Sequence, residues 1–185
     1  MNKNSLLPPG FRDDLSPTTE KEHLYKNKII SIFNNNGFQL VKPPLVEYLN
    51  KGFDDKNTFI INDKKKKKKL ILRNDITLQV ARISSSRLQK FNRPLKLCYY
   101  GEVVRNYGTI LRPERQFLQV GAECIGEKNL FADIEILVLA LESLLEVGIK
   151  NISIDFSNPI FLAEIINNDF VNIKKKKDFI KYVQR

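Results

Sequence analysis

The sequence holds few of the residues that build disulfide scaffolds or metal centres, with only two cysteines and one histidine among its 185 residues. Cys98 and Cys124 show no metal-ligand spacing. This excludes a disulfide-rich fold and argues against zinc or iron–sulfur chemistry. We therefore expect no metal, no cofactor and a reducing, cytoplasmic environment.

Long apolar runs are also absent. No stretch approaches the ~20 residues that a membrane-spanning helix needs, and residues 1–9 lack the apolar segment of a secretory signal. We expect neither a membrane segment nor a leader. With 42% hydrophobic and 28% charged residues, the chain can bury the core of one domain.

The charge is strongly one-sided but local. The formal net charge is +10, and two lysine runs, residues 64–69 and 174–177, account for the whole excess. A basic face spread over the fold is therefore not expected, which disfavours a general nucleic-acid binder. Each run is either a solvated tip or an anion-contacting patch, and the composition leaves both open.

Hydrophobic periodicity divides the chain into helices and strands. Ser16 and Pro17 are typical of a helix start, as N-cap and first helical residue, and Gly37 predicts the end of that helix. The strongest strands are residues 95–105 and 114–125, an expected antiparallel pair. Further strands are expected at 38–41, 58–61, 70–72 and 151–156, and helices at 76–89, at 132–147 (apolar nearly all round, hence buried) and from Asn158 to Asn167. The pattern predicts an α+β domain.

The strand at residues 114–125 carries the most information about function. Side chains alternate between its faces, and one face is an apolar core face: Leu118, Val120, Ala122, Cys124. The other face is polar: Arg115, Phe117, Gln119, Gly121, Glu123. Gln119 and Glu123 would lie about 13 Å apart at ~3.3 Å per residue, with Gly121 leaving room between them. That floor could hold a small polar ligand; the alternative is a solvent-facing strand of no functional consequence.

Two further polar groups could take part. Arg73-Asn74-Asp75-Ile76-Thr77 places a carboxylate and a hydroxyl at an expected helix start, where such groups also serve simply as caps. Arg105, at the end of its strand, could hold a phosphate or carboxylate, or form a surface salt bridge.

These segments resemble class II aminoacyl-tRNA synthetases. Residues 37–47 look like motif 1, which forms dimer contacts in that family. Leu-Arg-Asn-Asp-Ile-Thr at 72–77 is similar to a Leu-Arg-Pro-Glu-Gly-Thr stretch of histidyl-tRNA synthetase, residues 99–121 resemble its motif 2 region, and residues 119–126 its Gln-x-Gly-x-Glu signature. The resemblance implies a class II synthetase-like domain over residues 1–185, with a mixed, mainly antiparallel sheet flanked by helices.

The departures from the family pattern concern the nucleotide. Motif 2 has Phe-Arg-x-Glu, whose Arg and Glu contact ATP; here the Arg is Arg105, but the Glu position is Tyr107. A downstream arginine falls on Pro113, with Arg112 displaced by one. A phenol and a proline cannot replace a carboxylate and a guanidinium, so the resemblance implies an eroded ATP site. Arg105 and Arg115 remain candidate contacts for an anion or a vestigial nucleotide.

The positions that contact histidine look kept. The family's contacts to the amino group fall on Asp75, Thr77, Gln119 and Glu123. A sequence that keeps the histidine contacts and lacks the nucleotide contacts resembles the synthetase-like regulatory subunits of ATP phosphoribosyltransferase. Motif 3 is not found, so the domain is expected to be incomplete at its carboxy terminus.

The resemblance implies a non-catalytic regulatory subunit. Its expected partners are a short-form catalytic subunit, histidine as ligand, and a second copy through the motif 1 region; no membrane is expected, and nucleic acid is disfavoured. The alternatives are a histidyl-tRNA synthetase catalytic-core fragment, in which the lysines would contact tRNA phosphate, and a basic nucleic-acid binder.

Overall fold

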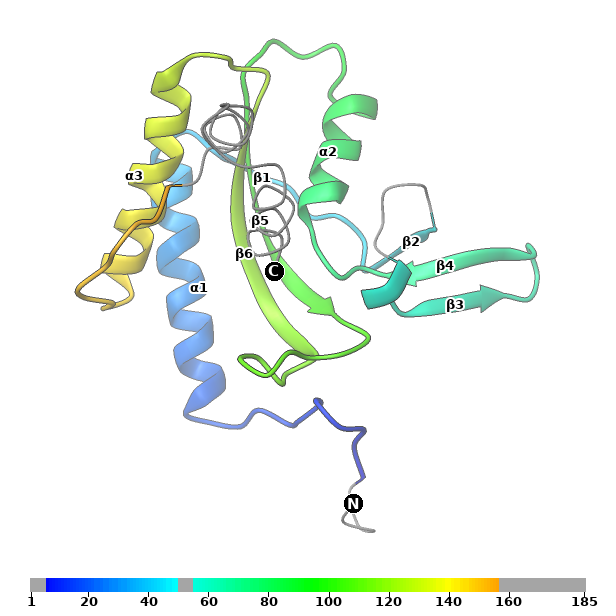
Figure 1. Cartoon of the computed structure of the whole chain (residues 1–185). Coiled ribbons are helices and arrows are strands. Elements are labelled where there is room, and N and C mark those ends of the chain that lie inside the picture. Colours follow the sequence, from blue (N-terminus) through cyan, green and yellow to red (C-terminus); the bar gives the residue numbers. More distant parts are fainter. Residues whose placement is uncertain (1–5, 50–54, 157–185) are drawn as a thin grey trace, which may run out of the picture. The chain divides into compact units, whose positions relative to one another are not determined.

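The computed structural model describes residues 6–49 and 55–156. The chain divides into two compact units, Met1–Lys150 and Asn151–Arg185. Every helix and strand described below belongs to the first unit (Figure 1).

A three-stranded sheet forms the centre of the first unit. β5 (Leu95–Val104) and β6 (Gln116–Ile125) pair antiparallel over ten residues each, and β1 (Gln39–Leu40) pairs parallel to β5. The order is β1-β5-β6, so the long strands and the mixed sheet are confirmed. The reason is local: the β-branched and aromatic residues of both strands alternate between two packed faces.

Helices cover both faces of this sheet. α1 (Thr18–Asn35) and α3 (Leu130–Glu146) lie on one face, and α2 (Thr77–Ser86) lies on the other (Figure 1). The face toward α1 and α3 holds one buried cluster: Ile30, Phe33, Phe38, Cys98, Leu139. The face toward α2 holds a second: Ile76, Val80, Leu95, Leu97, Tyr99, Val103. Val120 and Ala122 pack on the first cluster and Phe117 on the second, which confirms the predicted division of β6 into two faces.

The ends of α1 match the sequence only at the carboxy terminus. Gly37 follows the helix with φ +82°, the left-handed conformation predicted for it. At the other end Pro17 is the N-cap residue, and Ser16 donates its hydroxyl to Glu20 Oε1 at 2.8 Å. The predicted Ser16 cap is therefore wrong, because the helix begins at Thr18 with Pro17 as its N-cap, which leaves Ser16 one residue too far from the first turn.

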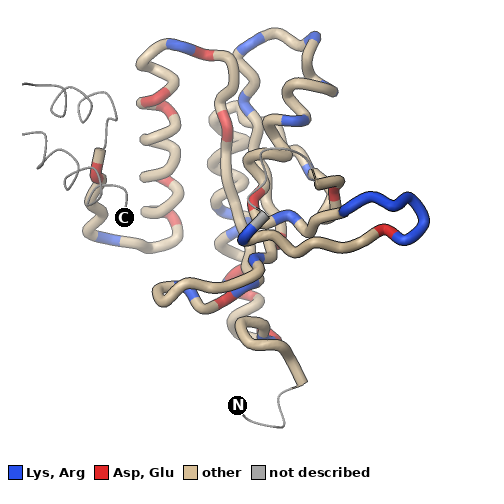
Figure 2. Tube along the Cα trace, turned by 45° about the vertical axis from the view of Figure 1, so that its right-hand side comes forward, with Lys and Arg blue, Asp and Glu red and all other residues tan. Residues whose placement is uncertain are grey.

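A second sheet projects beside α2. β3 (Ile60–Asp63) and β4 (Lys68–Leu72) form an antiparallel hairpin, and β2 (Val46–Tyr48) pairs with the other edge of β4. η1 (Asp55–Asn57), a short 3-10 helix, lies between β2 and β3 in the chain. Residues 64–67 form the turn, and all six lysines of residues 64–69 are exposed. Figure 2 shows this basic run, in blue, at the tip of the hairpin. The predicted lysine-rich hairpin tip is confirmed.

Two expectations for the end of the chain were wrong. The helix expected at residues 132–147 was predicted to be well buried, yet Ile134, Val138, Leu144 and Leu145 are exposed. Among the described residues, α3 packs its Leu139 side on α1 and β6. Residues 151–156 are not a strand: no backbone ladder pairs them within the described residues, and Phe156 is 80% exposed. The helix expected from Asn158 lies outside the described residues.

Within the ranges 6–49 and 55–156, the helices are too short or too polar to cross a membrane.

One buried cation fastens the second sheet to the first. Arg73 directly follows β4, and its guanidinium donates to the Glu102 carbonyl oxygen at 2.7 Å and to the Pro43 carbonyl oxygen at 3.0 Å. Burial lowers the pKa of Arg73, and the carboxylates of Glu102 and Glu47 oppose that shift. Gly101 leaves the room that this guanidinium occupies, since a Cβ there would overlap it.

Substituting Gly101→Ala should therefore destabilise the fold by ~1–3 kcal/mol through overpacking. The same substitution in an Arg73→Ala background should cost much less, because the overlapping group is gone. Urea unfolding of the four proteins of this double-mutant cycle gives the coupling energy. Equal costs in both backgrounds would contradict the contact.

Candidate functional site

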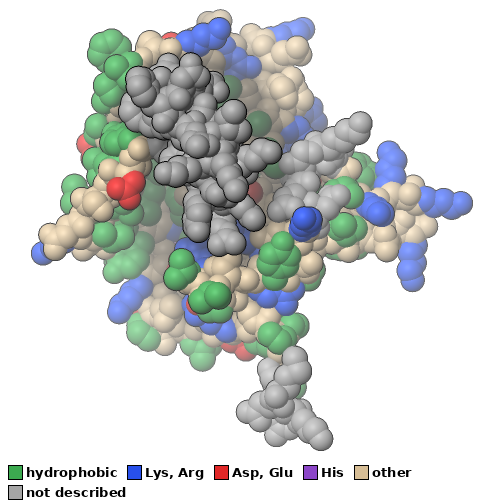
Figure 3. All heavy atoms as spheres, viewed as in Figure 1, with side chains coloured by type: hydrophobic (Ala, Val, Ile, Leu, Met, Phe, Trp, Pro, Cys, Tyr) green, Lys and Arg blue, Asp and Glu red, His purple; other side chains and the backbone are tan. Residues whose placement is uncertain are grey.

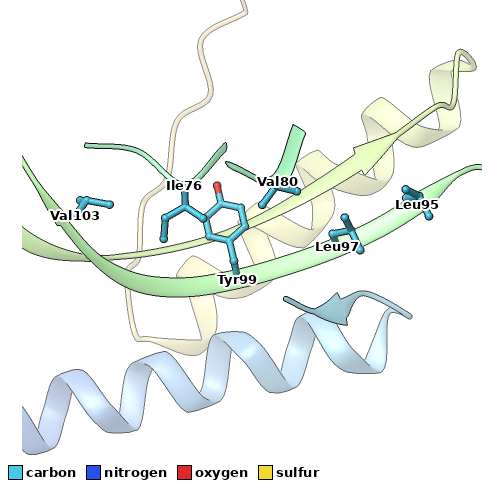
Figure 4. Packing of buried hydrophobic residues seen from close by; sticks show 6 residues of the cluster. All are labelled: Ile76, Val80, Leu95, Leu97, Tyr99 and Val103. Carbon is cyan, nitrogen blue, oxygen red and sulfur yellow. The ribbon is translucent and has the colours of Figure 1, made fainter. Parts of the chain in front are cut away.

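The candidate site begins with a tyrosine lying across a glycine. Tyr99 on β5 stands directly opposite Gly121 on β6, and a Cβ on Gly121 would lie 2.5 Å from the Tyr99 hydroxyl oxygen. Figure 4 shows the Tyr99 hydroxyl directed toward the side on which Ile76 lies, at the start of α2. The room at Gly121, expected to hold a ligand between Gln119 and Glu123, is therefore filled by this phenol.

The Tyr99 hydroxyl joins two of the four predicted histidine contacts. It donates its single proton to Glu123 Oε1 at 3.2 Å and accepts from the Thr77 hydroxyl, whose Oγ1 lies 3.1 Å away. Tyr99 itself is only 3% exposed, whereas Thr77 is exposed and Glu123 half-buried. The buried Tyr99 hydroxyl thus positions two more exposed side chains, those of Thr77 and Glu123, through hydrogen bonds.

Asp75 and Gln119 form the other half of the network. Gln119 Nε2 donates to Asp75 Oδ1 at 3.1 Å, and Gln119 Oε1 accepts from the Ile76 backbone N–H at 3.0 Å. Asp75 Oδ1 also accepts from the Thr77 N–H at 2.8 Å. Asp75 is not the N-cap, which is Ile76, but its carboxylate accepts one N–H of the first turn of α2 and ties the helix start to β6.

The structure thus brings all four predicted residues, Asp75, Thr77, Gln119 and Glu123, into one network, and Tyr99 is a fifth member that the family motifs did not assign to the site. Its signal in the sequence is indirect: a glycine on the facing strand leaves room for a large side chain. The register that pairs the two is not readable from either strand alone.

The electrostatics of the site suit a cationic ligand. Within the described part of the chain, Asp75 Oδ2 and Glu123 Oε2 accept no hydrogen bond, so each carboxylate keeps one oxygen for an ammonium or imidazolium group. Burial raises the pKa of Tyr99 to about 12, assisted by the charges of Glu123 and Asp75 and opposed by the Thr77 hydrogen bond. The phenol stays neutral and remains a donor.

A metal is not indicated by the same residues. Among residues 6–49 and 55–156, no group of three or more His, Cys, Asp or Glu side chains could hold a metal ion. Cys98 and Cys124 are free, and burial raises the pKa of both thiols.

Arg115 is already engaged by the protein. Its guanidinium donates to the carbonyl oxygens of Arg105 at 3.2 Å and Pro9 at 3.0 Å, and lies 4.9 Å from the ring centres of both Phe11 and Phe59. It ties the amino-terminal segment to the start of β6. An anion contact by Arg115 stays a prediction, and this geometry does not favour it.

Arg105 has a different environment. Its guanidinium lies 5.0 Å from the Phe117 ring centre, and the Arg112 guanidinium lies 4.6 Å from the same centre. Neither arginine forms an ion pair with any described residue. The displaced Arg112 thus lies against the same aromatic ring as Arg105, while Tyr107 and Pro113 supply no charge.

Comparison with known proteins identifies the family of this chain. The family model described as "Histidyl-tRNA synthetase" matches residues 10–185. The chain belongs to the histidyl-tRNA synthetase family. The resemblance predicted from the motifs is thereby confirmed.

Relatives of this family member carry two kinds of name. An "ATP phosphoribosyltransferase regulatory subunit" from Paramagnetospirillum magneticum is 41% identical over 176 residues, covering 89% of this chain and 46% of that protein. A crystal structure from Bacillus halodurans, of "an ATP phosphoribosyltransferase regulatory subunit/histidyl-tRNA synthetase", is 27% identical with a TM-score of 0.70, over 78% of this chain and 38% of that one.

The histidyl-tRNA synthetase of S. aureus, in its apo form, is 26% identical with a TM-score of 0.66, over 78% of this chain and 35% of that one. These structures confirm the predicted class II synthetase-like α+β fold. The chain spans less than half the length of the three relatives described here.

Replacing Tyr99→Phe tests the centre of the network. The raised pKa means that the neutral phenol contributes its full stability below about pH 10, the pKa of an unfolded tyrosine, and that this contribution is lost as pH rises toward about 12. The wild type should exceed the variant by about 1 kcal/mol in unfolding free energy at neutral pH. That difference should shrink above about pH 10.

Urea unfolding at neutral and at alkaline pH measures this difference. Tyr100→Phe is the matched control, since Tyr100 packs toward the α1 face and its hydroxyl donates to no described residue. A Tyr99→Phe difference that stays constant with pH would contradict the buried phenol.

Proposed function

We propose that this chain is a non-catalytic regulatory subunit of ATP phosphoribosyltransferase, which the short catalytic subunit needs for activity and for histidine feedback in histidine biosynthesis. The observation that carries the proposal is an asymmetry. Asp75, Thr77, Gln119 and Glu123 share one hydrogen-bonded network, whereas Tyr107 and Pro113 stand at the expected nucleotide-contacting positions. The names of relatives such as the Paramagnetospirillum magneticum protein support it.

The network fits histidine as the ligand. A free amino acid brings an ammonium group, and the imidazole adds a second group that can be cationic or donate. Two half-buried carboxylates, each with one unbonded oxygen, offer acceptors for both. Because Gln119 is held by Asp75 and by the start of α2, its amide is already oriented, so ligand binding needs little side-chain ordering.

Feedback would follow from differential binding. Histidine shifts the complex only as far as it binds the inhibited state more tightly than the active one. The site joins α2 to β6, so a ligand there acts on two elements at once. Self-association through the motif 1 region and a cytoplasmic location remain predictions.

Glu123→Gln tests the ligand. It keeps the shape of the side chain and removes its charge. The apparent affinity for histidine, measured from the thermal shift in a histidine titration, should therefore fall at least about tenfold. Glu142→Gln, an exposed carboxylate on α3, is the control and should titrate like the wild type. An unchanged response of Glu123→Gln would remove this residue from the histidine site.

Reconstitution tests the role. The short catalytic subunit, assayed with and without this chain, should show phosphoribosyltransferase activity only with it, and histidine should inhibit that activity. If the catalytic subunit neither co-purifies nor gains activity, the regulatory assignment is wrong.

A histidyl-tRNA synthetase core is the second candidate, favoured by the family match and by the S. aureus structure. It requires histidine-dependent pyrophosphate exchange. The regulatory proposal expects none, because the Tyr107 phenol and Pro113 supply neither the carboxylate nor the guanidinium that the resemblance assigns to ATP binding.

A further inference from the structure

The turn between β5 and β6 presents two aliphatic side chains where turns usually carry polar residues. Ile110 and Leu111 are 102% and 97% exposed. Central turn positions favour Gly, Asn, Asp and Pro. The two adjacent aliphatic side chains form a small contiguous apolar patch at the tip.

The turn is held in one shape by its own contacts. The Thr109 N–H donates to the Arg112 carbonyl oxygen at 2.7 Å, and the Arg112 N–H donates to Thr109 Oγ1 at 3.0 Å. The two arms touch at Gly108, where a Cβ would lie 2.5 Å from the Pro113 carbonyl oxygen. Ile110 and Leu111 thus sit at the tip of a closed reversal.

The base of the turn is anchored to a second element. The backbone N–H groups of Asn106 and Tyr107 donate to Asn57, at its carbonyl oxygen at 3.2 Å and at Oδ1 at 3.4 Å. Anchoring at the base and closure at the tip reduce the ordering cost that a flexible loop incurs on binding. These features are typical of a pre-formed contact surface.

The same loop carries two cations, Arg112 next to Leu111 in sequence and Arg105 at the base of the loop. Arg105 and Arg112 both stack on Phe117 and form no ion pair with the described residues. Figure 3 shows hydrophobic and basic side chains gathered near the end of the sheet where this turn lies. A matching surface therefore has an apolar pocket for Ile110 and Leu111 and carboxylates at its edge.

A protein surface fits this chemistry better than nucleic acid or lipid. Single-stranded nucleic acid is bound by aromatic stacking platforms, which two aliphatic side chains do not provide. Stable membrane association takes a larger apolar face, as on an amphipathic helix, or a lipid anchor. Two bulky side chains seated in a pocket are, in contrast, sufficient for an interface hot spot.

We propose that Ile110 and Leu111 dock into an apolar, carboxylate-rimmed pocket of the short ATP phosphoribosyltransferase catalytic subunit, an assignment that rests on the proposed function. The expected nucleotide-contacting positions Tyr107 and Pro113 lie in the same loop. The loop that lacks the expected nucleotide-contacting carboxylate and guanidinium is thereby assigned a role in binding the catalytic subunit.

The experiment compares affinities of the 185-residue chain for the short catalytic subunit from the same genome. The double variant Ile110→Ser, Leu111→Ser should bind about tenfold or more weakly, as for loss of a hot spot. Its thermal midpoint should not fall, because both side chains are already in water. Leu130→Ser is the matched control: it is 70% exposed, lies beyond the opposite end of β6, and should bind like the wild type.

Each outcome decides a different claim. If the unaltered chain binds and the double variant binds equally well, the docking assignment is overturned while the proposed function stands. If the unaltered chain does not bind at all, the proposed function fails and the docking assignment with it. If the double variant instead loses self-association, RNA binding or binding to anionic vesicles while keeping the catalytic subunit, the partner assigned here is wrong.

Discussion

The pairing of Tyr99 with Gly121 across the β5–β6 ladder is the contact on which the candidate site depends. The facing strand has no side chain at this point, so the phenol can lie across it and reach both α2 and Glu123. A slip of one residue in this ladder would turn Gln119, Gly121 and Glu123 to the opposite face. The apolar clusters on the two faces of the sheet fix that register, which is held over ten paired residues.

The site and the β5–β6 turn depend on the same two strands in different ways. Asp75, Gln119 and Glu123 stand on a helix start and on a strand whose backbone is fixed by its ladder, so their geometry is insensitive to changes in the turn. The turn carries Tyr107 and Pro113 and is held by its own contacts. A protein built this way can lose a nucleotide clamp from a loop and keep an amino-acid site on the sheet.

The lysine-rich hairpin is a separate feature. Asp63 Oδ1 accepts from the N–H groups of Lys65 and Lys66, which closes the turn without neutralising it, and Lys68 lies over the Tyr48 ring. The exposure of these lysines agrees with a solvated tip. It agrees equally with an anion-contacting patch, because both require the lysine side chains to lie in water.

The sequence by itself determined the elements whose signals are local. The β-branched and aromatic content of residues 95–105 and 114–125 predicted both long strands, and the two-residue alternation of residues 114–125 predicted the faces of that strand. Gly37 predicted a helix end, and the motif resemblance named four residues that the fold brings together. Local signals suffice there because side-chain direction repeats with the backbone.

Only the tertiary structure decided what distant residues do to one another. It put Tyr99 in the space left by Gly121, gave Arg115 to Pro9 and two aromatic rings, left one side of α3 exposed, and formed no strand at residues 151–156. The physical reason is common to all four. Burial, hydrogen bonding and strand formation require a partner, and the partner is chosen by packing between segments that no local pattern relates.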